Sequence, residues 1–262
     1  MPSRNDLHKY QERMVNFIYN APKCALWAGL GLGKTITTLT AIVDLIDSMA
    51  VSKVLIVAPL RVANSVWHKE AVNWQHTKHL KFSIVTGSEK ERLAALHKTA
   101  DVYVINRENV TWIVEHYAKK WPFDMIVLDE ASSFKSSSSQ RFKALRKTIP
   151  FTNRLVELTG TPSPNGLLDI WSQMYLLDCG ERLGRSMTAY KQRFFEAGYN
   201  GYSFKPVKSA DRIIHKLIDD IVISLNVDDY LEMPDRIDTV IRVSLPPSRM
   251  VEYKQLEREF LI

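Results

Sequence analysis

The sequence predicts an α/β fold, in which a mostly parallel sheet is covered by helices on both faces. Three observations predict it. Short apolar runs such as 53–58 and 125–128 alternate with segments of helical periodicity over the first two-thirds of the chain. Continuous apolarity indicates strands buried on both faces, as in a parallel sheet between two layers of helices. A strand, a glycine-rich turn and a helix follow one another at 23–49, which indicates a P-loop NTPase.

The expected elements follow from the periodicity of the apolar residues. Strands are expected at 23–27, 53–58, 82–85, 102–105, 125–128 and 154–158, with helices at 35–49, 62–75, 89–98 and 110–119. From Leu167 onward long amphipathic segments replace this alternation. Helices are expected there at 167–177, 188–195, 212–223 and 248–260, and one late strand at 239–243. The C-terminal part is therefore predicted to be a helical extension of the α/β domain.

Composition places the chain among ordinary globular proteins. Of its 262 residues 45% are hydrophobic and 24% charged, which allows a sizeable core. No apolar run is as long as a membrane span, and Met1–Asp6 is not followed by the hydrophobic segment of a secretory signal. The two cysteines, Cys24 and Cys179, cannot form a disulfide framework and indicate a reducing compartment. We therefore expect a cytoplasmic protein with no membrane partner.

The glycine-rich segment Ala28–Thr35 has the features of a phosphate-binding loop. Its glycines allow backbone N–H groups to gather round a polyphosphate, and the following helix adds the partial positive charge of its N-terminus. The backbone of the loop would bind phosphate, Lys34 would reach the β- and γ-phosphates, and the Thr35 hydroxyl would coordinate Mg²⁺. The expected nucleotide contacts in the loop are Leu30, Gly31, Leu32, Gly33, Lys34 and Thr35. The pattern A-x-x-G-x-G-K-T is typical of helicase-like motor proteins.

An acidic pair, Asp129 and Glu130, directly follows the buried run 125–128. Ligands bind beyond the carboxyl ends of parallel strands, so we expect both carboxylates at the site. Asp129 would hold Mg²⁺ opposite Thr35, and Glu130 would orient and deprotonate the water that attacks the γ-phosphate. Such a pair alone more often caps a helix. The phosphate loop in the same chain favours the catalytic interpretation.

Two further segments are less specific. Leu158–Pro162 places two threonines around a glycine after an apolar run, and on spacing alone a strand-exit turn with hydroxyl hydrogen bonds explains it better than a function does. Ser132–Arg154 contains six basic residues and no acidic residue. Such a stretch attracts phosphates by counterion release, although an ordinary solvated helix face explains it equally well.

Together these motifs resemble the SNF2-like branch of the superfamily 2 helicases, in the family's order and over essentially the whole chain. Leu7–Gln11 resembles the Q motif, in which the glutamine reads adenine, so Tyr10 and Gln11 are expected at the base. The remaining segments are similar to motif I (28–35), motif Ia (58–60 with Trp67), the next DNA-facing segment (104–106), motif II (129–132), motif III (158–162), the helix after it (165–171) and the helical protrusion (212–234).

The resemblance implies a RecA-like three-layer αβα fold. It also implies an ATP-binding lobe at 1–166, a helical protrusion at 167–236, and a return strand with a linker helix at 237–262. Nothing in the chain resembles motifs IV to VI, whose arginines complete the ATP site from a second RecA-like lobe. The chain is thus expected to be the first lobe of a longer protein, with a second lobe as its partner. Compact members of this kind are similar to phage or prophage proteins, which indicates a bacterial or phage-infected host cell.

The function that the resemblance implies is an ATP-dependent DNA translocase, a DNA-dependent ATPase that uses ATP and Mg²⁺. Double-stranded DNA would be bound through its phosphates without sequence preference. The expected DNA contacts are Arg61, Asn106, Arg107, Lys135, Thr159 and Thr161. A second hypothesis is an ATP-gated module that binds DNA or a protein with little turnover. The absent arginines support it for this chain, since such residues are worth roughly 10³–10⁵ in rate.

The sequence departs from the family pattern at three places. Trp27-Ala28-Gly29-Leu30 stands where motif I usually begins with an acidic residue and Met or Gln. Ser132 ends motif II, where His or Gln is usual. Ile223–Asn226 replaces the usual paired arginines before a late Leu-Pro. Trp67 is predicted to pack a helix on the sheet rather than to stack on a base.

Overall fold

The computed structural model describes residues 1–198, 203–230, 244 and 246–260, and the chain divides into two compact units, Met1–Leu231 and Glu232–Ile262. The first unit contains a sheet of seven described strands in the order β3-β4-β2-β5-β6-β1-β9, and all neighbouring strands are parallel. The strands are β1 (Lys23–Ala28), β2 (Val54–Ala58), β3 (Phe82–Val85), β4 (Val102–Asn106), β5 (Met125–Asp129), β6 (Arg154–Thr159) and β9 (Val222–Leu225). The predicted fold class is confirmed.

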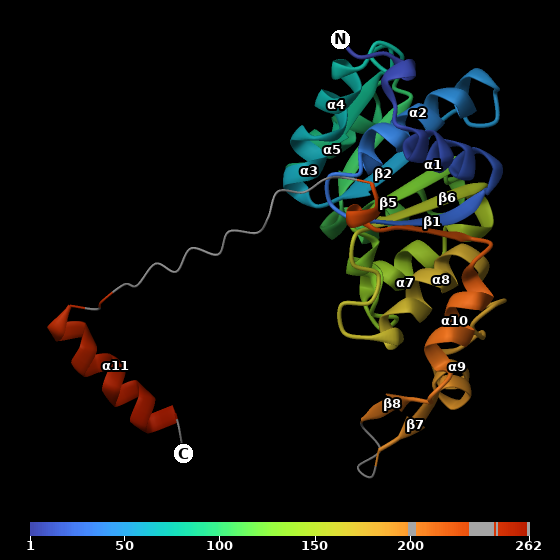
Figure 1. Ribbon diagram of the computed structural model, residues 1–262. Coiled ribbons are helices and arrows are strands. Elements are labelled where there is room, and N and C mark those ends of the chain that lie inside the picture. Colours follow the sequence, from blue (N-terminus) through green and yellow to red (C-terminus); the bar gives the residue numbers. More distant parts are fainter. Residues whose placement is uncertain (199–202, 231–243, 245, 261–262) are drawn as a thin grey trace. The chain divides into compact units, whose positions relative to one another are not determined.

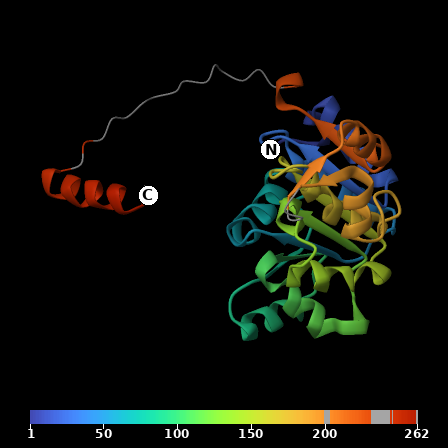
Figure 2. The ribbon, with the colours of Figure 1, turned by 90° about the horizontal axis from the view of Figure 1, so that it is seen from below.

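Helices cover both faces of this sheet, which gives three layers (Figures 1 and 2). One face packs against α1 (Lys9–Asn20), α2 (Lys34–Asp47), α3 (Leu60–Ser65) and α4 (Trp67–Asn73). The other side carries α5 (Glu89–Leu96), α6 (Val110–Tyr117), α7 (Gln140–Arg146), α8 (Ile170–Asp178), α9 (Met187–Phe194) and α10 (Ala210–Ile218). Alternate strand residues serve the two cores: Leu26 faces the first layer and Ala25 the second.

The strand order brings the motif-bearing turns to one edge of the sheet. Because all strands are parallel, the turns after β1, β5 and β6 leave at the same edge. Strand β6 lies between the other two, with Thr159 opposite Trp27 and Leu158 opposite Asp129. The phosphate loop, the acidic pair and the threonine-glycine turn therefore lie side by side, although about 130 residues of the chain separate the first from the last.

One expected element is wrong in its second half. The segment 212–223 was expected to be a single helix, but α10 ends at Ile218 and β9 extends the sheet beside β1, with Ala25 opposite Val222. The backbone N–H of Ala25 donates to the carbonyl of Ile221, 2.8 Å away. The apolar, partly β-branched run Ile221–Leu225 gains these ladder bonds at the open edge of β1, which a continued helix would not supply.

Other differences are smaller. The helix expected at 62–75 is divided into α3 and α4, which meet at Val66. The helix expected at 188–195 stops at Phe194 and is followed by the antiparallel hairpin β7 (Phe195–Ala197) and β8 (Phe204–Pro206). The strand expected at 239–243 lies outside the described residues.

The second unit contains α11 (Pro247–Phe260), close to the expected helix at 248–260. Its apolar side chains Val251, Tyr253 and Leu256 are exposed. Within the described residues, no helix of either unit has the length and apolarity needed to cross a membrane. The domain boundaries expected at 166/167 and 236/237 remain predictions.

Candidate active site

The phosphate loop has the backbone conformation that its glycines predict. Strand β1 ends at Ala28, and α2 begins at Lys34 with Gly33 at its N-cap. Gly31 and Gly33 have φ angles of 85° and 74°, in the left-handed region that residues with a Cβ rarely adopt. Leu30 between strand and helix is 80% exposed. The loop therefore curls back on itself at the N-terminus of α2, where backbone N–H groups attract anions.

The side chain of Gln11 is hydrogen-bonded to the loop near its C-terminal end, at Leu32. Its side chain is buried; Nε2 donates to the carbonyl of Leu32 at 3.4 Å, and Oε1 accepts from the backbone N–H of His8 at 2.9 Å. A Cβ built on Gly33 would lie 2.2 Å from Gln11 Nε2. Gly33 is thus favoured by its φ angle, and a Cβ at this position would also force the amide end of Gln11 to move. This contact joins the segment expected at the base to the segment expected at the phosphates.

Lys34 is directed at the beginning of its own loop. Its ammonium donates to the carbonyls of Ala28, at 2.6 Å, and Gly29, at 3.0 Å. Burial lowers the pKa of Lys34, while the carboxylates of Glu130 and Asp129 act in the opposite direction. The ammonium is thus held over the loop and close to both expected catalytic acids.

Asp129 is fixed by a tryptophan from the neighbouring layer. Its Oδ2 accepts a hydrogen bond of 3.0 Å from the indole Nε1 of Trp67, a residue with no exposed surface. Burial raises the pKa of Asp129, and the indole hydrogen bond opposes that shift by stabilising the carboxylate. Trp67 is buried as predicted, but it also orients the carboxylate expected to hold magnesium.

Glu130 has an unusual backbone conformation. Its φ and ψ angles are 55° and 56°, in the left-handed region that is costly for a residue with a Cβ. Such strain is typical of functional positions, where the surrounding structure enforces it. Here the turn after β5 directs Glu130 into the pocket that Asp129 also lines.

The loop and the acidic pair line one pocket of about 360 Å³. Lys34, Thr35, Asp129 and Glu130 all contribute, together with Gly31 and Gly33. The remaining lining residues are Leu30, Ile36, Val62, Val66 and Glu70. The structure therefore brings together residues that are almost 100 positions apart in the sequence.

These residues fit a magnesium ion held jointly with a phosphate chain. Thr35 and Asp129 supply two oxygen donors in one pocket, and the Trp67 bond occupies one oxygen of Asp129. No group of three or more His, Cys, Asp or Glu side chains suited to a metal occurs among the described residues. Magnesium commonly takes only one or two protein carboxylates and obtains its other ligands from phosphates and water, so this small donor set is compatible with it.

The threonine-glycine turn is packed tightly between the other two motifs. Thr159 is completely buried, and its hydroxyl accepts from the backbone N–H of Thr161 at 3.1 Å. A Cβ on Gly160 would lie 3.5 Å from the carbonyl of Ala28, so this turn touches the beginning of the phosphate loop. The side chain of Gln173 in α8 donates to the carbonyl of Pro162 at 2.6 Å.

The six expected DNA contacts divide into two groups. Arg61 and Thr161 are exposed, Arg107 is half-buried, and all three follow strands at the edge of the sheet that carries the pocket. Lys135 forms an ion pair of 3.5 Å with Asp169. These four side chains keep some exposed surface at that edge.

The other two expected DNA contacts, Asn106 and Thr159, have buried side chains, and their role in DNA binding remains a prediction. Asn106 is only 6% exposed; its Nδ2 donates to Glu108 and its Oδ1 accepts from Asn109, so its amide builds the turn after β4. Thr159 is buried between β1 and β5 as described above. Both side chains satisfy local backbone geometry and do not face solvent, which agrees with the strand-exit turn that the spacing of 158–162 favoured.

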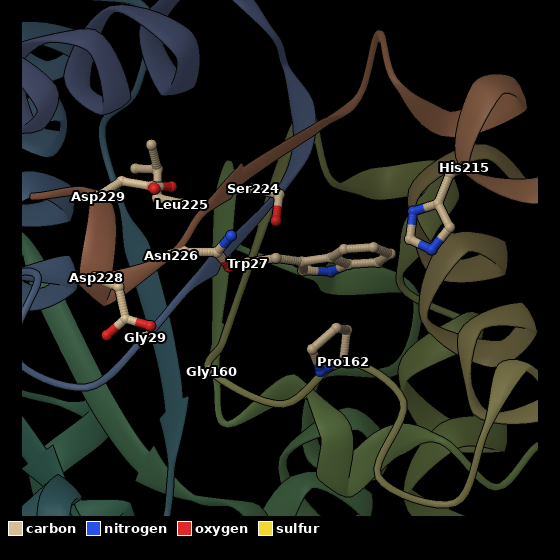
Figure 3. A pocket seen from close by; sticks show the side chains of 10 residues that line it. All are labelled: Trp27, Gly29, Gly160, Pro162, His215, Ser224, Leu225, Asn226, Asp228 and Asp229. Atoms are coloured by element: carbon tan, nitrogen blue, oxygen red, sulfur yellow. The ribbon is translucent and has the colours of Figure 1, made fainter. Parts of the chain in front are cut away.

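Two of the departures from the family pattern lie against each other. Ala28 is opposite Leu225 and Trp27 is opposite Ser224 in the β1–β9 pair. Beside them is a pocket of about 530 Å³, which Figure 3 shows with the Trp27 indole between Pro162 and His215. The segment that lacks the family's usual acidic residue is at the end of β1, and the segment that lacks its usual arginines is in β9, so the two departures are on paired strands.

Sequence analysis missed three residues of this region. Trp67 was expected only as packing, and Glu70, which lines the pocket and accepts from the indole of Trp74 at 3.0 Å, was not singled out. Tyr230 was not considered, yet its ring lies against that of Tyr10. No spacing in the sequence marks these positions, because each is brought to the site by an element whose place only the fold determines.

Comparison with known proteins gives a consistent family. The profile of the SNF2-related domain matches residues 10–261. Protein p41 of Acyrthosiphon pisum secondary endosymbiont phage 1 is 38% identical over 264 residues, covering 97% of this chain and 57% of p41. The human DNA excision repair protein ERCC-6-like is 28% identical, covering 70% of this chain and 15% of its own length.

The fold is also similar to solved structures. The Sulfolobus solfataricus SWI2/SNF2 ATPase core in complex with dsDNA superposes with a TM-score of 0.70 at 22% identity, covering 95% of this chain and 51% of that one. The ATPase core domain from the same organism gives a TM-score of 0.64, also at 22% identity, over 97% of this chain and 51% of that one. The chain spans about half the length of these proteins and of p41.

Proposed function

Because the chain belongs to the family of SNF2-related domains, we propose that it is the first motor lobe of an ATP-dependent translocase on double-stranded DNA. The observation that carries this proposal is the single pocket lined by Lys34, Thr35, Asp129 and Glu130. A phosphate-binding loop and an acidic pair in one pocket are the parts that hydrolysis of a nucleoside triphosphate needs.

Each residue of the pocket has a role in this proposal. Backbone N–H groups of the loop and the Lys34 ammonium bind the phosphates, and Lys34 then exchanges its two carbonyl partners for phosphate oxygens. Thr35 and Asp129 hold Mg²⁺, which neutralises the charge that develops on the phosphates. Glu130 accepts a proton from the attacking water and aligns it with the γ-phosphate. Gln11 reads the adenine edge.

DNA is proposed to bind at the same edge of the sheet. Arg61, Arg107 and Lys135 supply positive charge there, and Thr161 supplies a hydroxyl. Contacts of these types bind phosphate oxygens and carry no sequence information, so binding is expected to be tolerant of sequence and sensitive to salt. The solved relative whose title includes dsDNA supports the choice of duplex for testing.

A second lobe is proposed to complete the ATP site in a longer protein. The support is the half-length match to p41 and to the solved ATPase cores. For the 262-residue chain alone we propose weak ATP turnover. In that respect the isolated chain would behave much like the alternative, an ATP-gated binding module with little turnover. The phage relative supports a bacterial or phage-infected cytoplasm as the place of action.

The proposal is tested by steady-state ATP hydrolysis and by ATP binding, each with and without duplex DNA. Lys34→Ala should abolish tight binding of ATP with Mg²⁺, whereas Glu130→Gln should keep binding and remove hydrolysis. Lys98→Ala is the matched control for Lys34→Ala, because Lys98 is exposed and follows α5 at the opposite edge of the sheet.

The outcomes separate the alternatives. Unchanged ATP affinity in Lys34→Ala would show that the loop is not the nucleotide site. Binding without turnover in the wild-type chain supports a lobe that needs its partner. Turnover far above the Glu130→Gln blank and raised by duplex would contradict the incomplete-site part of the proposal, since one lobe would then suffice.

A further inference from the structure

An aromatic pair joins two distant parts of the first unit. The rings of Tyr10, in α1, and Tyr230, after β9, have centroids 4.8 Å apart and planes tilted by 46°. Tyr10 is 8% exposed and also stacks on the ring of His8, at 5.3 Å and 7°. Tyr230 is 40% exposed. The inner ring is therefore covered by its neighbours, while the outer ring keeps a free surface.

The position of Tyr230 follows from the edge strand. Strand β9 runs parallel to β1 and ends with Leu225 opposite Ala28, where the phosphate loop begins. A short 3₁₀ turn (Val227–Asp229) follows, closed by the N–H of Asp229 donating to the carbonyl of Asn226 at 3.4 Å. We call residues 226–230 the strap. It leads from the end of β9 to α1 and ends with Tyr230 on Tyr10.

The strap ends on Tyr10, the residue that directly precedes Gln11 in α1. Gln11 follows Tyr10 directly and contacts both Leu32 and Gly33 of the loop. Neither Tyr10 nor Tyr230 is among the described residues that line the pocket shared by Asp129 and Glu130. The tyrosine pair thus includes the chain neighbour of Gln11, the residue proposed to read the base, and it lies outside the pocket expected to hold the reacting phosphates.

We propose that Tyr230 is a nucleobase contact, whose exposed ring stacks on the base of the nucleotide that the loop binds. This inference rests on the proposed function of the loop. Rings with centroids 4.8 Å apart are already in contact, so a base would stack on the outer face of Tyr230 rather than between the two rings. Tyr10 then acts as a positioning residue, because its ring packs on the face of Tyr230 opposite the base.

The proposal divides the recognition of the nucleotide between two side chains. Stacking on an aromatic ring tolerates any base, because every base has a π-face. Hydrogen bonds from an amide depend on the edge of the base. Tyr230 therefore sets the affinity for the base, and Gln11 sets the preference for adenine. The departure from the family pattern at Ile223–Asn226 ends at Asn226, the first residue of this strap.

The test compares a ligand that has a base with one that has none. Binding of ADP with Mg²⁺ and of inorganic triphosphate is measured by calorimetry for the wild-type chain and for Tyr230→Ala, Tyr230→Phe and Tyr19→Ala. Tyr19 is the matched control because it is 38% exposed and lies at the other end of α1. We expect Tyr230→Ala to weaken ADP binding roughly five- to fiftyfold and to leave triphosphate binding unchanged. Tyr230→Phe and Tyr19→Ala should bind both ligands like the wild type.

Other results overturn the inference. Equal ADP affinity in Tyr230→Ala and the wild type means that Tyr230 does not touch the base, and tighter ADP binding means that it blocks the site. An equal loss for ADP and triphosphate means that the substitution disturbs the loop rather than a stacking contact. If the wild type binds neither ligand, the proposed function itself fails, which is a different result from failure of the stacking contact.

Discussion

The indole nitrogen of Trp67 donates a hydrogen bond of 3.0 Å to Oδ2 of Asp129. The bond joins α4 to the end of β5, two elements more than 60 residues apart. Trp67 is completely buried, so its ring cannot turn away without disturbing the layer between α2 and the sheet. The orientation of the carboxylate is therefore fixed by the core, before any ligand binds.

Trp67→Phe should lose this hydrogen bond and also leave a cavity in the core, because the phenyl ring is smaller than the indole. Partners of metal-binding residues typically contribute about 10- to 100-fold to metal affinity or activity. We expect a loss in that range for the magnesium dependence of ATP binding, together with a loss of stability from the cavity, which urea unfolding measures separately. Trp112→Phe is the control, because its indole bonds to Glu89, far along the chain from the pocket residues. An unchanged magnesium dependence in Trp67→Phe would mean that Asp129 needs no support.

Gly33→Ala should weaken ATP binding, whereas the same change at another glycine with positive φ should not. Gly33 has φ of 74° and a Cβ would lie 2.2 Å from Gln11 Nε2, whereas Gly166 has φ of 102° and nothing within 4 Å. The backbone strain is about 1–2 kcal/mol at Gly33, in the left-handed helical region, and about 1–3 kcal/mol at Gly166, whose ψ of −176° lies in a region essentially restricted to glycine, but only Gly33→Ala also displaces Gln11. Urea unfolding of both variants measures the difference, and ATP binding should suffer in Gly33→Ala alone. Equal losses of stability and binding would show that Gln11 moves aside freely.

Glu157 should make the protein less stable as pH rises. It is fully buried in β6, and neither carboxyl oxygen has a hydrogen-bond partner in the described structure. Burial raises the pKa of Glu157 well above its usual value. The folded state thus keeps a proton that the unfolded chain releases above about pH 4.5. From that pH up to the folded pKa the free energy of unfolding falls, by at most about 1.4 kcal/mol per pH unit.

Glu157→Gln should flatten this dependence, because the amide has no proton to lose. The measurement is urea unfolding at several pH values between 5 and 8, with the exposed Glu91→Gln as control. The variant is expected to gain stability relative to the wild type as pH increases. A wild-type profile that stays flat over this range would mean that a partner or water stabilises the charged carboxylate.

Arg61→Ala should weaken DNA binding evenly across sequences. Arg61 is exposed just after β2, at the edge of the sheet that carries the pocket. Losing one phosphate contact reduces the slope of log affinity against log salt by about 0.9. Fluorescence anisotropy with two unrelated duplexes at several salt concentrations measures this slope, and Lys98→Ala should leave it unchanged. A sequence-dependent loss would instead place Arg61 on a base edge.

Much of the fold could be predicted because the strands are locally marked. Six of the seven described sheet strands coincide with apolar runs, since a strand buried on both faces needs apolar residues throughout. The exception, β9, also has a largely apolar sequence but follows a helical segment closely, so periodicity assigned its first two residues, Val222 and Ile223, to that helix. Its assignment depends on the open edge of β1, which no local pattern reveals.

The site divides in the same way. Sequence by itself predicted the phosphate loop and the acidic pair, because Gly31, Gly33, Lys34, Asp129 and Glu130 are the residue types that nucleotide hydrolysis would need at those spacings. Tertiary structure alone decided which side chains surround them. In the folded chain Thr159 is buried, and the amide of Asn106 donates within the turn after β4. The indole of Trp67 donates to Asp129, and the ring of Tyr230 packs on that of Tyr10. The physical reason is that burial and contact depend on the packing of whole elements, whereas the conformation of a glycine loop depends on its own residues.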